Sequence, residues 1–108
     1  MEDNTIYKYV EKWPEFPGGE SALLTFLKSN LEYPKLAKDI HLTGTVHVSF
    51  IVWKDGTIRN IDIMRGIGSG CDEEVIRVIN KMPTWNPGIQ GGQKVNVSFH
   101  IPVSFKLR

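Results

Sequence analysis

The stretch VNVSFHIPVSFKL, residues 95–107, decides the fold of this chain because apolar and polar side chains alternate through it without interruption. Strict alternation predicts a β-strand with one buried and one solvent-facing side. The predicted strand is more than twice the usual length of about 5–6 residues. It also contains Pro102, and strands tolerate proline mainly at a sheet edge or a bulge. The pattern therefore predicts a long edge strand, to which a partner strand can add.

Composition limits the kind of protein. The chain has 108 residues and is 41% hydrophobic, which suits one domain with a modest core. Its net charge of +1 gives no reason to expect nucleic acid or an anionic membrane as a partner. No apolar run approaches the roughly 20 residues that cross a bilayer. The single cysteine, Cys71, excludes an internal disulfide and a multi-thiolate metal site.

The sequence divides into an extended segment of residues 1–19, called here the lead-in, and a domain of residues 20–108. The lead-in ends in the stiff run WPEFPGG, residues 13–19, whose prolines disfavour helix. A helix is predicted over residues 20–31, where leucines recur every four positions. Tyr33-Pro34 ends this helix, and Pro34 suits the first turn of a second short helix to about Ile40.

The middle of the chain predicts a hairpin followed by a helix. Residues 45–53 alternate as a strand, Lys54-Asp55-Gly56 signals a turn, and residues 57–65 form the return strand. The return strand is less regular, which a bulge would explain. After a glycine-rich loop, a helix is predicted over residues 72–81. Glu73 and Arg77 are expected to pair on it, four residues apart.

These elements predict an α+β fold built on a three-stranded antiparallel sheet, with the helices packed on one face. The helix after the second strand returns the chain to the start of a third strand that is antiparallel to the first. A right-handed crossover then gives the spatial order 2-1-3. The C-terminal strand lies at an edge, in agreement with its proline.

Taken together, these landmarks resemble the C-terminal domain of the TonB family of energy transducers, over about residues 33–107. The matching pieces, in order, are Tyr33-Pro34, the strand GTVHVSF of residues 44–50, Asp55-Gly56, the helix of residues 72–82, the run MPTWNPG of residues 82–88, and residues 95–107. The run WPEFPGG of residues 13–19 and the helix of residues 20–31 resemble the longer version found in Bacteroidetes-type members.

The resemblance implies a non-enzymatic periplasmic domain, without a cofactor, on a stalk anchored in the inner membrane. Such a domain captures the TonB-box peptide of an outer-membrane transporter as an added strand beside the family's last strand. Through its anchor it would work with inner-membrane proton-channel proteins and transmit their pulling force. The anchor and the proline-rich stalk are absent from these 108 residues.

Backbone parity narrows the expected binding site. In an antiparallel ladder the N–H and C=O of one residue face the same neighbour, and successive residues alternate. Pro102 lacks an N–H, so it faces the open edge at least cost, and every second residue before it does the same. We expect a peptide centred on residues 96–100 and limited by Pro102. An open alternative is that Pro102 only guards the edge against self-association. The predicted peptide-binding residues are Asn96, Val97, Ser98, Phe99, His100, Ile101 and Pro102.

Other chemistry-bearing residues receive structural interpretations. We interpret His47 and His100 as solvent-facing strand residues rather than metal ligands, because two imidazoles without a nearby carboxylate are weak evidence for a site. We interpret Cys71 as a small packing residue rather than a thiol of lowered pKa. The carboxylates Asp72, Glu73 and Glu74 complement the dipole of the helix that they start.

Three questions stay open at this point. Trp85 is expected to anchor the helix to the sheet, but Trp13, Ile51 and Trp53 are either covered by the lead-in or form an exposed patch for a partner. The domain could instead belong to a membrane-embedded sensor or metallopeptidase, which native upstream sequence would decide. An exposed edge can also pair with a second copy of the chain to give a homodimer.

Overall fold

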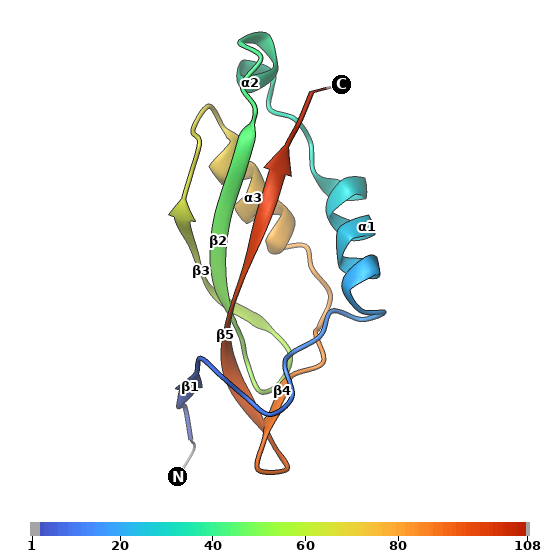
Figure 1. The fold of residues 1–108 in the computed structure, drawn as a ribbon, viewed down its shortest axis with the longest axis vertical. Helices are drawn as coiled ribbons and strands as arrows, with labels where there is room; N and C mark the ends of the chain where they lie inside the picture. Colours follow the sequence, from blue (N-terminus) through green and yellow to red (C-terminus); the bar gives the residue numbers. More distant parts are fainter. Residues whose placement is uncertain (1–2, 108) are drawn as a thin grey trace.

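The computed structural model describes residues 3–107, in which three long strands form the body of a curled sheet (Figure 1). These strands are β2 (Gly44–Val52), β3 (Ile58–Arg65) and β5 (Gln93–Phe105). β2 lies between β3 and β5 and is antiparallel to both. The predicted order of these three strands is therefore confirmed, and β5 follows the long axis of a molecule that measures 51 × 24 × 19 Å.

The sheet has more strands than predicted, and it is mixed rather than purely antiparallel. β1 (Ile6–Tyr7) pairs in parallel with β5 opposite Asn96 and Val97, on the side away from β2. β4 (Gly88–Gln90) forms a tight hairpin with the start of β5. The prediction of a three-stranded sheet was wrong on this point because strands of two or three residues are too short to show any periodicity.

Register differs between the two long strand pairs. The β2–β5 ladder runs without a shift from Gly44 opposite Phe105 to Val52 opposite Val97. The β2–β3 ladder shifts twice, so the irregularity predicted for the hairpin is present. An unshifted ladder keeps the alternation of inward and outward peptide groups constant along β5.

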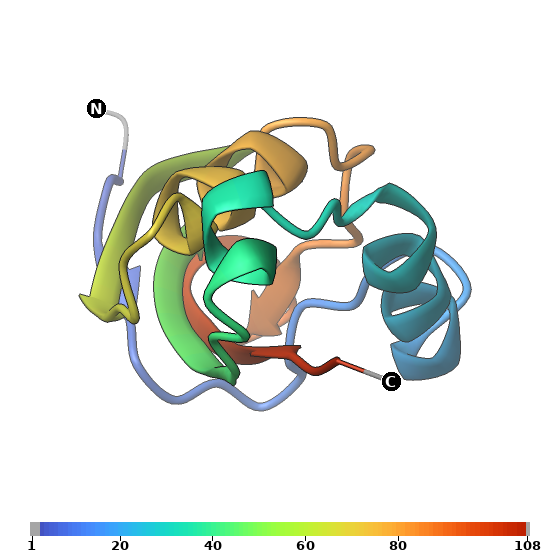
Figure 2. The same ribbon diagram turned by 90° about the horizontal axis from the view of Figure 1, so that it is seen from above.

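The helices lie on the concave side of the sheet, as Figure 2 shows along the long axis. They are α1 (Glu20–Asn30), α2 (Lys35–Asp39) and α3 (Cys71–Ile79), and their bounds differ from the predicted ones by one or two residues. No helix among residues 3–107 is long and apolar enough to cross a membrane.

The core lies between the concave face and the helices. Trp85 is 2% exposed, and its ring centroid lies 5.6 Å from that of Phe50 in the sheet and 5.7 Å from that of Phe16 in the lead-in. Trp85 is thus a buried core residue that joins the sheet to the lead-in, whereas the sequence predicted that it would anchor the helix to the sheet. The inward side chains of β2 and the buried face of α3 belong to the same core, together with buried side chains of α1, α2 and β5. The residues of β2 and α3 are Val46, Val48, Phe50, Val52, Cys71, Val75, Val78 and Ile79.

Arg77 of α3 does not pair with Glu73, contrary to the prediction. It donates from Nε to Glu74 Oε1 at 2.6 Å and from Nη2 to the carbonyl of Asn30 at 3.0 Å. Glu74 also accepts the N–H of Glu32 at 2.6 Å. Arg77 pairs with Glu74 because both side chains also bond to the backbone just at the end of α1. These tertiary hydrogen bonds favour Glu74 over the partner that the four-residue helix spacing predicted. The Arg77 hydrogen bonds hold the pKa of Glu74 below its usual range.

Candidate functional site

The outer side of β5 carries the candidate site. β1 covers it at Asn96 and Val97, and no described strand pairs with it over residues 98–105. Unpaired N–H and C=O groups in such a row form a template for a further strand. We call residues 98–105 the open edge. Figure 1 shows β1 beside the lower part of β5, with α1 beyond its upper part.

Asn96 was expected on the solvent-facing side, and the structure shows otherwise. It is 1% exposed. Its Oδ1 accepts the N–H of Lys54 at 2.8 Å, and its Nδ2 donates to the carbonyl of Thr5 at 3.3 Å. The side chain therefore ties the hairpin turn to the lead-in. A polar residue in an alternating pattern is predicted to be exposed, because the sequence does not show the hydrogen-bond partners that allow it to be buried.

Pro102 lies opposite His47, and the ladder continues unshifted on both sides of this pair. A proline that faced β2 would remove a donor from the ladder between the two strands. The regular pairing thus supports the interpretation that Pro102 turns its missing N–H toward the open edge. That edge then has a gap in its donors at residue 102.

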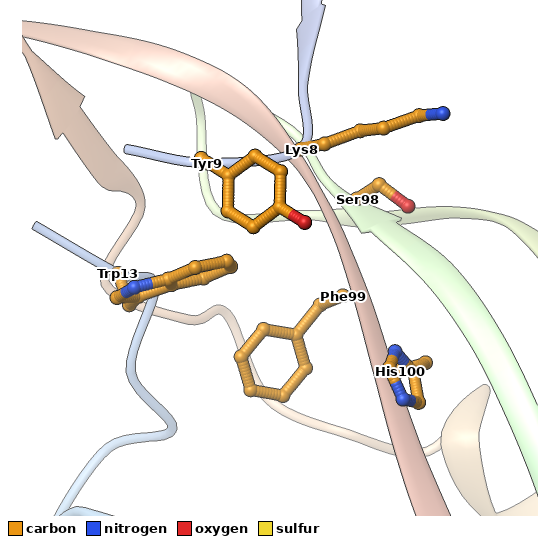
Figure 3. Close-up of a pocket in the computed structure, with 6 residues that line it drawn as sticks. All are labelled: Lys8, Tyr9, Trp13, Ser98, Phe99 and His100. Atoms are coloured by element: carbon orange, nitrogen blue, oxygen red, sulfur yellow. The ribbon is translucent and has the colours of Figure 1, made fainter. Parts of the chain in front are cut away.

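Two hollows flank the open edge. One hollow, of about 330 Å³, has residues 99–102 of β5 on one side and the lead-in and the start of α1 on the other. The other hollow, of about 340 Å³, lies where the lead-in leaves β5. Its lining residues are Lys8, Tyr9, Trp13, Ser98, Phe99 and His100 (Figure 3).

The structure thus brings together most of the predicted site and separates the rest. Residues 98–102 line one or both hollows, whereas Asn96 and Val97 are covered by β1. Tyr9, which lines the hollow of Figure 3, was not among the predicted site residues. Its signal was the aromatic content of the lead-in, but only the fold places that segment beside β5.

Cys71 has the character of a packing residue. It is fully buried, and this burial, with the nearby negative charges of Asp72 and Glu73, raises the pKa of its thiol. The interpretation as a structural residue is confirmed.

The glycine-rich loop before α3 directs two backbone N–H groups at Asp72. The carboxylate accepts the N–H of Ile67 at 2.9 Å and also contacts that of Gly68. These loop donors are therefore already bonded within the chain.

The two strand histidines sit two register positions apart: His47 faces Pro102, and His100 faces Ser49. Within residues 3–107 no group of three or more histidine, cysteine, aspartate or glutamate side chains could hold a metal ion.

Trp13, Ile51 and Trp53 do not share one surface. Ile51 is buried, and Trp53 is half-buried with the Arg59 guanidinium 4.3 Å from its ring centroid. Trp13 contacts the ring of Phe99, which lies on the opposite face of the sheet from Ile51. A common patch of these three side chains is therefore excluded.

Solved structures with the same fold are TonB C-terminal domains. The Helicobacter pylori TonB C-terminal domain, residues 179–285, is similar at 23% identity and a TM-score of 0.56, covering 85% of this chain and 87% of that one. The Pseudomonas aeruginosa domain is similar at 26% identity and a TM-score of 0.51, covering 71% and 80%. No curated protein matches the chain significantly.

The fold and its open edge define a small α+β domain of the TonB type. Residues 29–107 match the family described as Gram-negative bacterial TonB protein C-terminal. This match covers more than two thirds of the chain, and the chain belongs to that family. Its domains are typically non-enzymatic and periplasmic, and they generally bind TonB-dependent receptors. Membership implies a role in energy transduction.

Proposed function

We propose that this domain captures the TonB-box peptides of outer-membrane transporters by adding a peptide strand to the open edge of β5. It is then the periplasmic end of an inner-membrane energy transducer and transmits a pulling force to the transporter. The force would come from inner-membrane proton-channel proteins through an anchor outside these residues. Family membership supports the general role, and the open edge supports the mode of capture.

The observation that carries the proposal is the side of β5 over residues 98–105 with which no described strand pairs. The elements on either side of this edge limit the length that a peptide can occupy. β1 occupies the edge up to Val97. Pro102, which has no N–H, would interrupt the donors farther along. The predicted site of seven residues therefore contracts to Ser98, Phe99, His100, Ile101 and Pro102. A short extended peptide fits this interval, since each added residue spans about 3.3 Å.

Strand addition also suits a force-bearing contact. A ladder pulled along its length loads several hydrogen bonds together, whereas a ladder peeled from one end breaks them in turn. β5 follows the long axis of the molecule, so a strand beside it would share that direction.

Titration of the isotope-labelled domain with TonB-box peptides from transporters of the same organism tests this proposal. We expect amide shifts concentrated at residues 98–101. β3 offers an internal reference, because it forms the opposite edge of the same sheet. Shifts at β3 alone, or none at β5, would refute capture at the open edge.

His100→Pro provides a matched variant. If His100 faces outward, this change removes one outward N–H, as Pro102 already does two residues later, and leaves the β2–β5 ladder intact. We expect peptide affinity to fall at least about tenfold while the spectrum keeps its folded pattern. Ser104→Ala, an exposed change in the same strand that keeps the N–H, should leave affinity unchanged.

A further inference from the structure

The lead-in borders the open edge although it lies outside the part of the chain that matches the family. After β1 it leaves β5 and is attached again at Lys12, whose N–H and C=O bond to Ile89 at 3.1 and 2.9 Å. Glu15 makes the same pair of bonds with Asn86, both 2.9 Å. These attachments hold the intervening side chains beside residues 98–100.

Two large aromatic side chains of the lead-in stand in solvent at this point. Tyr9 is 82% exposed and Trp13 is 46% exposed. The ring centroid of Trp13 lies 6.5 Å from that of Tyr9 and 6.3 Å from that of Phe99, edge-on in both cases. Figure 3 shows the three rings around one space, with the Lys8 side chain pointing away from it.

We propose that Tyr9, Trp13 and Phe99 form a pocket for one large apolar side chain of the strand that adds to β5, an inference that rests on the proposed function. A strand beside β5 directs alternate side chains to the face that Phe99 occupies. The pocket lies against residues 98–100, where that strand would begin beyond β1.

The chemistry of the pocket favours an apolar occupant. Three of its six lining residues carry the rings of Tyr9, Trp13 and Phe99, the other three are Lys8, Ser98 and His100, and none is a carboxylate. Its volume of about 340 Å³ accommodates a large aliphatic or aromatic side chain. Such a side chain would remove exposed ring surface from water. The lead-in would thereby make binding specific for the peptide sequence, because the backbone hydrogen bonds along β5 do not depend on which side chains the peptide carries.

A double-mutant cycle tests the pocket. The TonB-box peptide and its variants, each with one apolar residue replaced by alanine, are titrated against the wild-type domain and against Trp13→Ala. We expect one peptide position at which alanine weakens binding to the wild type about tenfold. Against Trp13→Ala the same replacement should have almost no further effect.

Tyr9→Ala repeats the cycle with a residue so exposed that its removal leaves the fold intact. Met64→Ala is the matched control, since Met64 is 60% exposed on β3 at the opposite edge, and it should leave every affinity unchanged. Peptide binding with β5 shifts but no coupling to Tyr9 or Trp13 would overturn the pocket alone. Absence of peptide binding to the wild type would overturn the proposed function as well.

Discussion

At the scale of single residues, Gly56 connects the hairpin turn to the aromatic anchor behind the open edge. Its φ is +86°, and its carbonyl accepts the N–H of Trp85 at 2.9 Å. A Cβ placed there would lie 2.2 Å from the carbonyl oxygen of Trp85. The ring of Trp85 in turn lies 5.3 Å from that of Phe99. The turn therefore needs glycine for its conformation and for its close approach.

Gly56→Ala should destabilise the domain by about 2 kcal/mol or more, because it adds a clash with backbone to the cost of a positive φ. Gly91→Ala is the matched control. Gly91 also has a positive φ, +58°, but a Cβ there meets nothing within 4 Å. Urea unfolding of both variants measures the difference. Equal losses of unfolding free energy would contradict the packing argument.

At the scale of elements, β5 makes a different contact along each part of its length. Its start forms a hairpin with β4, and β1 covers the next two residues. β2 pairs with β5 from Val97 to Phe105, and beyond Val97 no strand within residues 3–107 pairs with the side opposite β2. Pro102, which has no N–H, would interrupt the donors on that side. One strand thus combines a structural and a proposed binding role.

Pro102→Ser restores an outward N–H and should lengthen the edge available to a partner strand. We expect the peptide-induced shifts to extend toward Ser104, or self-association of the domain to increase. Peptide titration followed by NMR and sedimentation of the free domain measure these two effects.

The control for this variant is Ser104→Ala, which changes an exposed side chain of the same strand without adding a donor. If Pro102→Ser changes neither the footprint nor the oligomeric state, Pro102 is neither a limit to the peptide nor a guard of the edge.

At the scale of the whole molecule, the lead-in joins both ends of the chain. Its first part pairs with β5, and its second part inserts Phe16 into the core. The Phe16 ring lies 5.4 Å from that of Phe26 in α1 and 5.7 Å from that of Trp85. The boundary proposed from the sequence, after residue 19, would separate this side chain from the core that it contacts.

Two truncations test that boundary. Deletion of residues 1–12 removes β1 but keeps Phe16, whereas deletion of residues 1–19 removes both. We expect the longer deletion to cost about 3–5 kcal/mol more, the usual loss for a buried phenylalanine. Urea unfolding of the two proteins measures this difference. Equal stabilities would show that residues 13–19, including Phe16, add nothing to the stability of residues 20–108.

Sequence periodicity was sufficient for the long elements. Alternation in residues 45–53 and 95–107, together with the leucine spacing of α1, predicted strands and helices to within one or two residues. It also predicted the order of the three long strands, but β5 is an edge strand only beyond Val97, because β1 pairs with its earlier part. These features follow from the sequence because a long amphipathic segment buries one face whatever its neighbours are.

Tertiary structure alone decided how much of that edge is open. β1 is two residues long and Asn96 is polar, so neither carries a local signal of its position. Their placement depends on contacts between residues about ninety positions apart, such as Asn96 with Thr5. The sequence by itself thus determined a long final strand next to β2, and it overstated the length of the edge, because β1 covers part of it. The packing of the lead-in determined where that edge begins and which aromatic side chains stand beside it.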